Sequence, residues 1–184
     1  MKMLGFFVTC LWYTLPAYLG NMAPVFAKKA FKERFSTPID LGREFRGKRI
    51  AGNHKTYRGF LSAIIISMVM VVFQRELYAS GNFVSVSVVD YTKINYIVFG
   101  FLMGFGAMFG DLSKSIIKRR LDKDPGESWR PYDQIDFVVG AILITSIIYV
   151  PPLSVILGMV IFVPLTKVFV DNMGVYLKIY DQRW

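Results

Sequence analysis

Apolar blocks close to the length of a membrane-spanning helix alternate with highly charged segments along this 184-residue chain. About 20 predominantly apolar residues cross the hydrocarbon core of a bilayer as a helix. The blocks cover about residues 3–27, 59–78, 94–112, 132–150 and 152–170. With 54% hydrophobic and only 19% charged residues, the composition is not that of an ordinary soluble domain. We therefore expect an all-α integral membrane protein, a single polytopic domain with five transmembrane helices.

The last two blocks form one apolar stretch, Phe137 to Val170, in which Lys167 is the only charged residue. Pro151 and Pro152 near its middle predict two helices joined by a tight turn. The first of these helices is short unless it begins near Tyr132.

Basic residues set the expected topology. Residues 28–58 hold ten lysines and arginines against three acidic residues. By the positive-inside rule this loop is cytoplasmic, which places the N-terminus outside. Five spans then bring residues 113–131 to the same side and leave the C-terminus, with Lys178 and Arg183, in the cytoplasm. The two charged loops can therefore meet and form a site.

Several kinds of site and partner are excluded. Cys10 is the only cysteine and His54 the only histidine, so an intramolecular disulfide and a His/Cys zinc site are both ruled out. Any bound metal should have oxygen ligands. The formal net charge of +9 reports topology first, and two short basic loops offer little surface for nucleic acid.

The stretch from 110 to 136 is where chemistry is most expected. If residues after Gly110 continue as a helix, one face carries side chains at i, i+4, i+7 and i+11: Asp111, Ser115, Lys118 and Asp122. Pro125 and Gly126 break this helix. A second helix can begin near Pro131, with Asp133 and Asp136 on one face of its first turn. Acidic faces beside a basic cluster suit Mg²⁺ bound together with a polyphosphate.

Two simpler interpretations of this stretch remain open. Asp133 and Asp136 could merely complement the positive end of a helix dipole, and the basic residues could form an ordinary membrane-flanking cluster.

A second basic segment, GNHKTYRG, gathers Lys55, Thr56 and Arg58 between two glycines at a membrane entry. Such a turn lets the backbone approach phosphates closely, while the loop as a whole also fits anionic lipid headgroups.

These motifs resemble the CTP-dependent phosphatidate cytidylyltransferases. An S-x-x-K-R core, here Ser115, Lys118 and Arg119, precedes an acidic end at Asp133 and Asp136, and GKRIAGNHKTYRG is similar to the first cytoplasmic motif of that family. The chain departs from the bacterial and eukaryotic enzymes because it has RPYDQID in place of an H-G-G segment. This variant resembles the archaeal branch of the family, the CDP-archaeol synthases.

The resemblance implies transfer of the cytidylyl group of CTP to 2,3-bis-O-geranylgeranylglycerol 1-phosphate, an unsaturated archaetidic acid, with release of pyrophosphate. It implies a cell-membrane enzyme that is Mg²⁺-dependent, with the metal bound by Asp111, Asp133 and Asp136, or with Asp136 positioning the water ligands of the metal instead. These three residues and Lys118 are the implied catalytic residues. The implied binding residues for CTP or for the lipid phosphate are Asn53, Lys55, Thr56, Arg58, Ser115, Lys118, Arg119 and Arg120. Ser115 could equally serve helix packing.

Rival hypotheses within enzymes are a CDP-diacylglycerol synthase acting on ester lipids and a CTP-dependent polyprenol kinase. Outside enzymes, a small transporter or a scaffold that binds anionic headgroups fits the basic loops.

Four glycines at close to four-residue spacing, Gly100, Gly104, Gly106 and Gly110, predict close helix contact in the third span. That spacing also permits a homodimer without establishing one.

Overall fold

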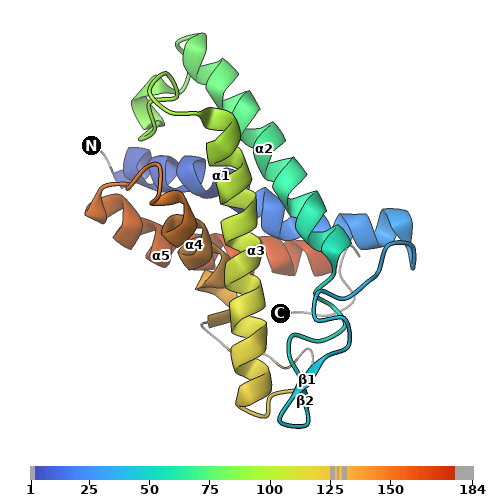
Figure 1. Cartoon of the computed structure of the whole chain (residues 1–184). Coiled ribbons are helices and arrows are strands. Elements are labelled where there is room, and N and C mark those ends of the chain that lie inside the picture. Colours follow the sequence, from blue (N-terminus) through green and yellow to red (C-terminus); the bar gives the residue numbers. More distant parts are fainter. Residues whose placement is uncertain (1–2, 125–126, 128, 130–131, 177–184) are drawn as a thin grey trace.

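The computed structural model describes residues 3–124, 127, 129 and 132–176. Its helices are α1 (Met3–Phe31), α2 (Tyr57–Ala79), α3 (Tyr96–Arg120), α4 (Tyr132–Thr145) and α5 (Leu153–Tyr176), with a short 3-10 helix, η1 (Val84–Val86) (Figure 1). A small antiparallel hairpin, β1 (Glu44–Phe45) and β2 (Lys48–Arg49), lies in the first charged loop. The named secondary-structure elements of the described part are therefore helices, as predicted, apart from this hairpin.

Four of the helices are long and apolar enough to cross a membrane: α1, α2, α3 and residues 153–170 of α5. The predicted fourth span, 132–150, was too long, because α4 has 14 residues and ends at Thr145. At 1.5 Å per residue it measures about 21 Å, less than the roughly 30 Å of a hydrocarbon core. Pro151 and Pro152 separate α4 from α5, as the sequence indicated.

Other bounds also differ from those predicted. The third helix continues past the predicted end of the span at 112 to Arg120, so residues 113–120 are helical and not part of a loop, as the alternative of a helix continuing after Gly110 had it. The first helix runs to Phe31, past the predicted end at 27. The expected helix break at Pro125 and Gly126, the start near Pro131, and the C-terminal Lys178 and Arg183 lie outside the described residues.

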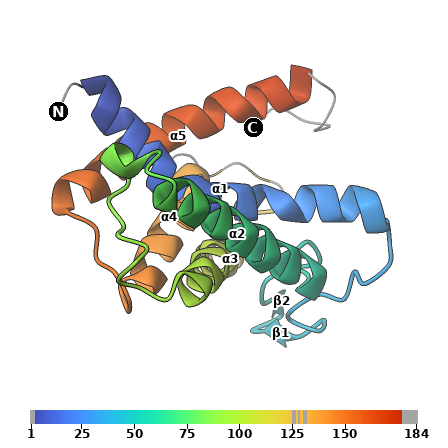
Figure 2. The same cartoon turned by 90° about the horizontal axis from the view of Figure 1, so that it is seen from above.

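Helix α3 packs at the centre of the molecule, between α2 and α4 (Figures 1 and 2). Gly100 and Gly104 face α2, where an added Cβ would press on the backbone of Met68 and Ile64 at 2.9 and 2.6 Å. Gly106 and Gly110 face α4 in the same way. The glycine spacing of the third span therefore serves helix packing within the chain.

Helix α1 crosses α3 instead of running beside it (Figures 1 and 2). Pro16 lies inside α1 and has no N–H, so it leaves the carbonyl of Trp12 without its helical donor. The buried amide of Gln74 on α2 donates to that carbonyl at 2.6 Å, and Tyr91 Oη donates to Gln74 Oε1 at 2.9 Å. A buried polar network thus compensates the proline and ties α1 to α2.

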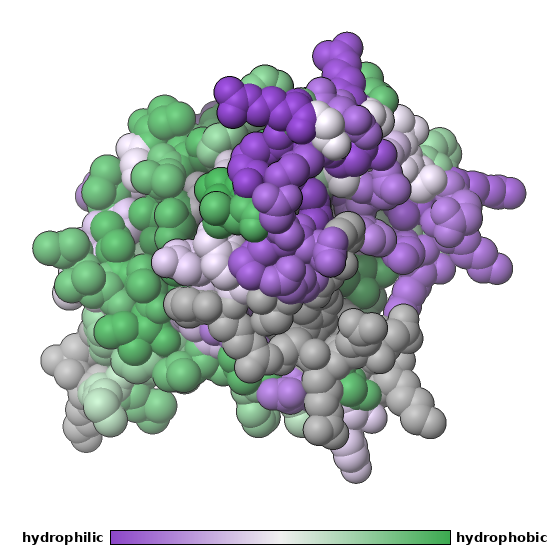
Figure 3. All heavy atoms as spheres, turned by 90° about the horizontal axis from the view of Figure 1, so that it is seen from below, coloured by the Kyte–Doolittle hydropathy of each residue, from purple (hydrophilic) through white to green (hydrophobic). Residues whose placement is uncertain are grey.

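Seen from below, hydrophilic residues gather on one part of the surface, and hydrophobic residues cover a broad area beside it (Figure 3). The hairpin and the C-terminal end of α3 lie at the bottom of the molecule in Figure 1, the end that Figure 3 views. The apolar side surfaces include exposed side chains such as Leu61, Phe73 and Leu165. Exposed apolar flanks with a polar end are what a chain surrounded by lipid requires.

Candidate active site

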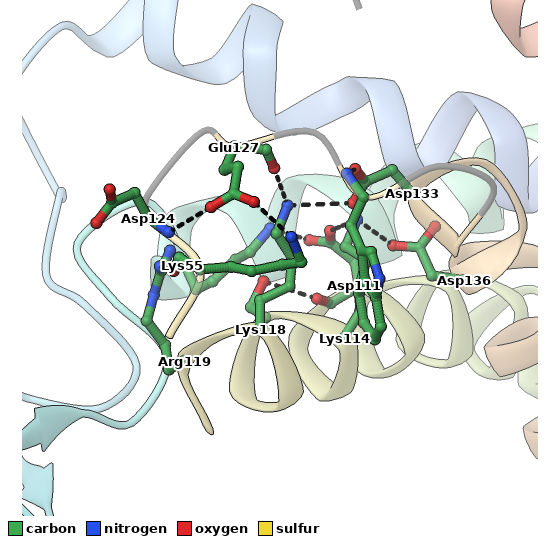
Figure 4. Close-up of polar contacts among 12 residues, drawn as sticks. Lys55, Asp111, Lys114, Lys118, Arg119, Asp124, Glu127, Asp133 and Asp136 are labelled. Carbon is green, nitrogen blue, oxygen red and sulfur yellow. Dashed lines mark hydrogen bonds and ion pairs between the residues drawn. The ribbon is translucent and has the colours of Figure 1, made fainter. Parts of the chain in front are cut away.

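Charged side chains converge where the C-terminal half of α3, the first turns of α4 and the loop before α2 meet (Figure 4). Helix α3 supplies Asp111, and α4 supplies Asp133 and Asp136 from one face, as their i, i+3 spacing predicted. A Cβ added to Gly110 would overlap the main-chain carbonyl of Asp136. Backbone contact between the two helices therefore brings the three carboxylates together.

The ammonium of Lys114 lies among these three carboxylates. Its Nζ is 2.6 Å from Asp136 Oδ2, 3.2 Å from Asp133 Oδ1 and 3.4 Å from Asp111 Oδ1. The Lys114 side chain is 14% exposed, and that of Asp136 is 5% exposed. Removing charges from water costs several kcal/mol per ion unless they are paired, so this cluster depends on its internal counterions.

Two further lysines complete the cluster. Lys55 Nζ donates to Asp111 Oδ2, which joins the loop before α2 to α3. Lys118 is buried, donates to the carbonyl of Glu127, and lies 3.4 Å from Asp133 Oδ1. The structure thus brings together the two charged segments that the sequence suggested could meet.

The donor chemistry of the cluster fits a hard cation. Mg²⁺ prefers carboxylate oxygens together with substrate phosphate oxygens, and three carboxylates are present here. Asp136 Oδ1 is buried and accepts no hydrogen bond from the described residues, so it has an unused lone pair directed into the protein. Within the described part of the chain no three carboxylate, His or Cys side chains stand close enough to enclose a metal as they are. The carboxylates of Asp111, Asp133 and Asp136 stand instead at ion-pair distances from the ammonium of Lys114.

A cavity of about 290 Å³ lies between the hairpin and the end of α3. It is lined by Lys48, Arg49, Gly52, Asn53, Arg119, Asp122, Lys123 and Asp124. Arg119 Nη1 donates to the carbonyl of Lys123, while its Nε is buried with no hydrogen-bond partner among the described residues. The cavity lining therefore includes Asn53 and a guanidinium with one N–H that makes no hydrogen bond to the described residues. Both residues were predicted from the sequence to bind substrate.

The remaining predicted binding residues have structural contacts in this protein. Arg120 turns to the hairpin, donates to the carbonyls of Phe45 at 2.6 Å and Arg49 at 3.0 Å, and stacks on the Phe45 ring. Thr56 caps α2 by accepting from Gly59 N at 3.2 Å. A role for Arg120 or Thr56 at phosphate stays a prediction.

Arg58 and Ser115 likewise bond to the backbone. Arg58 Nη1 donates to the carbonyls of Lys32 at 2.7 Å and Arg34 at 2.6 Å, away from the carboxylates. Ser115 Oγ donates to the carbonyl of Asp111 at 2.9 Å, the local helix bond that serines often make. Their roles at phosphate also stay predictions.

Residues 3–184 of the chain match the CarS-like family, described as CDP-archaeol synthase. The chain belongs to this family. The resemblance found in the S-x-x-K-R core and its acidic end is thereby confirmed, including its archaeal branch.

Curated members of the family match over nearly their whole length. The CDP-archaeol synthase of Methanoculleus marisnigri is 34% identical over 178 residues, which cover 92% of this chain and 99% of that protein. The CDP-archaeol synthase of Methanocaldococcus jannaschii is 32% identical over 176 residues, covering 95% of each chain.

A solved structure of an intramembrane enzyme for archaeal membrane lipids biosynthesis has a similar fold. It superimposes with a TM-score of 0.70 at 26% identity, covering 88% of this chain and 92% of that one. Together with the four spanning helices, this likeness identifies a multi-pass membrane protein.

Sequence reasoning missed two lysines of this family member. Lys114 lies within the central stretch, three residues after Asp111, but spacing along one helix did not reveal that α4 would surround it with carboxylates. Lys167 on α5 donates to the carbonyl of Asp133 at 2.8 Å and lies 5.0 Å from the centre of the Phe137 ring. A charged residue in an apolar helix was the available signal for Lys167.

A third site feature lies in the first charged loop. Asp40 is buried and accepts hydrogen bonds from Arg49 Nη2 at 2.6 Å and from the backbone N–H groups of Gly42, Ala51 and Gly52. Burial alone would raise the pKa of Asp40, but these bonds hold its pKa well below the usual range. Asp40 therefore fixes the loop that carries the cavity lining.

Proposed function

We propose that this protein transfers the cytidylyl group of CTP to 2,3-bis-O-geranylgeranylglycerol 1-phosphate, forming CDP-archaeol and pyrophosphate in archaeal lipid synthesis. Membership of the CDP-archaeol synthase family supports the reaction. The observation that carries the mechanism is the convergence of three carboxylates with Lys55, Lys114 and Lys118 at the polar end of spanning helices.

The reaction needs neutralisation of phosphate charge more than it needs a general acid or a general base. The lipid phosphate is already ionised near neutral pH, so its oxygen can attack the α-phosphorus of CTP without a dedicated base. A phosphorus–oxygen bond forms to the lipid phosphate, and the bond from the α-phosphorus to the bridging oxygen breaks as pyrophosphate leaves. Positioning the reactants and stabilising charge on the phosphate oxygens supply the catalysis.

Asp111, Asp133 and Asp136 would hold Mg²⁺, which when bound supplies a positive charge to the polyphosphate. Lys55 contacts Asp111 from the loop before α2, and Lys118 contacts Asp133 from the last turns of α3. In this arrangement they would bind the triphosphate and the departing pyrophosphate.

We place the nucleotide at the cavity between the hairpin and α3. Its volume of about 290 Å³ is close to the lower limit of ligand pockets. Arg119 Nε has hydrogen-bonding capacity to spare there, and Asn53 supplies an amide that can both donate and accept. The carboxylates and this cavity would lie on the cytoplasmic side, which the basic first loop favours.

The test is pyrophosphate release by purified protein in detergent, supplied with CTP, Mg²⁺ and the geranylgeranyl ether lipid phosphate. ATP replaces CTP in one comparison, and an ester lipid phosphate replaces the ether lipid in another. We expect turnover that requires CTP and favours the ether lipid. Preference for the ester lipid would indicate CDP-diacylglycerol synthase instead.

Two other outcomes would reject the proposal. A polyprenol kinase would release CDP instead of pyrophosphate when given a polyprenol. A transporter or scaffold would give no turnover with either lipid in protein that is shown to be folded.

A further inference from the structure

Lys114 occupies the position that a cation would take among the three carboxylates of Asp111, Asp133 and Asp136 (Figure 4). Its Nζ lies 2.6 to 3.4 Å from one oxygen of each. Mg²⁺ binds oxygen at about 2.0–2.1 Å, so the carboxylates are held at the spacing of an ammonium and not of a metal.

The negative charges of this cluster are compensated as they stand. Three carboxylates face Lys55, Lys114 and Lys118, and Lys167 on α5 adds a fourth positive charge that acts on Asp111 and Asp136, so no negative charge is left uncompensated. A divalent cation would add two positive charges to a buried site, where uncompensated charge is costly. Either one ammonium must move away or the phosphates of the nucleotide must enter with the metal.

Lys114 is the lysine that a metal held by the three carboxylates would have to displace. Lys55 pairs with Asp111, and Lys118 contacts Asp133 and the carbonyl of Glu127, whereas Lys114 contacts all three carboxylates. The contacts that the structure gives to the Lys114 ammonium are the carboxylates themselves. Its four-carbon stem can swing without any change in the α3 backbone, and an ammonium binds phosphate as readily as carboxylate.

We propose that the Lys114 ammonium is an exchangeable internal cation: it holds the three carboxylates together when no metal is bound, and Mg²⁺ displaces it towards the polyphosphate of the nucleotide. This inference rests on the proposed function, because it takes the carboxylates to be the Mg²⁺ ligands. It assigns Lys114 two successive partners, the carboxylates and then the substrate phosphates.

The experiment compares thermal unfolding of Lys114→Met with wild type in detergent, first in EDTA and then across a Mg²⁺ titration without CTP. Without its ammonium the variant has an uncompensated carboxylate cluster, so we expect a lower Tm in EDTA. Mg²⁺ no longer competes with an internal cation, so we expect the half-saturating Mg²⁺ concentration to fall by about tenfold. Mg²⁺ should also raise the Tm of the variant by more than that of wild type.

The matched control is Lys93→Met, which removes an ion pair with Asp90 at 3.1 Å in the loop between α2 and α3. Its Mg²⁺ response should equal that of wild type. If Lys114→Met does not fold, Lys114→Gln purified in Mg²⁺ and then transferred to EDTA gives the same comparison, because glutamine removes the charge but keeps a polar group.

Turnover provides a second readout that a merely structural role would not give. We expect Lys114→Met to need less Mg²⁺ for half-maximal rate while its kcat falls, since the ammonium is missing from the phosphates. A Tm loss that is equal with and without Mg²⁺, with an unchanged Mg²⁺ requirement, would overturn this inference alone. Absence of any Mg²⁺-induced shift in wild type, both without and with CTP, would overturn the metal assignment of the proposed function as well.

Discussion

Lys55 and Asp111 are 56 residues apart in the sequence, yet their side chains form an ion pair beside the C-terminal half of α3. The pair joins the first charged loop to the helix that carries the S-x-x-K-R core. Lys55 is 20% exposed and Asp111 is 14% exposed, so the pair is shielded from solvent and from salt. Loop and helix therefore contribute to one site.

The carboxylates give the most direct prediction. We expect Asp111→Asn and Asp136→Asn each to lower turnover by on the order of 10²-fold or more, because the polyphosphate would lose a ligand of its metal. Pyrophosphate release with saturating CTP measures this effect. Asp90→Asn, a change in the loop between α2 and α3, should retain the wild-type rate. Retained turnover in both site variants would reject the metal assignment.

Lys167 is predicted to position α4. Its ammonium donates to the carbonyl of Asp133 at 2.8 Å, so Lys167→Met should loosen the first turn of α4 and the carboxylates on it. We expect kcat to fall about tenfold, because small displacements of catalytic groups are costly. Lys167→Arg should restore part of the rate if donation to the carbonyl is what matters. Equal rates in Lys167→Met and wild type would show that α5 does not position the site.

Gly110 is predicted to tolerate no side chain. In Gly110→Ala the added methyl group would meet the carbonyl of Asp136, and overpacking of this kind costs about 1–3 kcal/mol. Both Tm and turnover should fall. Gly59→Ala is the comparison for Tm, since its Cβ would lie 3.3 Å from Pro24 Cβ and from Thr56 Oγ1, and these neighbours need to shift only slightly. A Gly110→Ala protein as stable and active as wild type would mean that α3 and α4 can separate freely.

The first charged loop should lose stability in acid through Asp40. The pKa of Asp40 is held well below its usual range by Arg49 and three backbone N–H groups, against the effect of burial. A lowered folded pKa means that the carboxylate stabilises the protein above the ordinary Asp value of about 3.9, and that this contribution is lost as pH falls through the folded value. At neutral pH, Asp40→Asn should therefore lower Tm.

The same Tm difference between Asp40→Asn and wild type should narrow progressively in buffers below pH of about 4, because the Asp40 carboxyl of the unfolded wild-type chain takes up a proton there while that of the folded protein stays ionised. Asp122→Asn, at an exposed ion pair with Lys48, is the control and should change Tm little at any pH. A Tm difference for Asp40→Asn that does not depend on pH would show that the charge of Asp40 is not what stabilises the loop.

Topology can be tested with single cysteines, since Cys10 is the only native one and is buried. In a Cys10→Ala background, Thr37→Cys lies in the first charged loop and Asn82→Cys lies between α2 and α3. A maleimide that does not cross membranes should label Asn82→Cys in right-side-out vesicles and Thr37→Cys in inverted ones. The reverse pattern would place the site on the outer side.

The sequence predicted the helices better than their ends. The apolar runs located all five helices, because the thickness of the bilayer sets the length of apolar sequence that a span needs. The sequence allowed the third helix to continue after Gly110 but could not decide where it ends, since a basic last turn of a helix and a basic loop have the same composition. Nor did it show that α4 stops at Thr145, because residues 146–150 are apolar as well.

Within the site, spacing along one helix predicted which helical residues share a face but not which residues face them. Its extension to Asp122 was wrong, because α3 ends at Arg120 and Asp122 pairs with Lys48 at the surface. Asp133 and Asp136 were grouped correctly, and they lie together on α4. The direction of Arg120 depends on a hairpin that its own neighbourhood does not encode. The position of Lys114 depends on α4, which packs against it only through the tertiary fold.

The contact of Gly106 and Gly110 with α4 has a consequence for how the site responds to heat. A contact made by backbone atoms has no rotamers to repopulate, so warming changes side-chain disorder elsewhere in the membrane domain more than it changes the separation of α3 and α4. The geometry between Asp111 and Asp136 should then persist up to the temperature at which the two helices part. Loss of activity on heating should accordingly be abrupt instead of gradual.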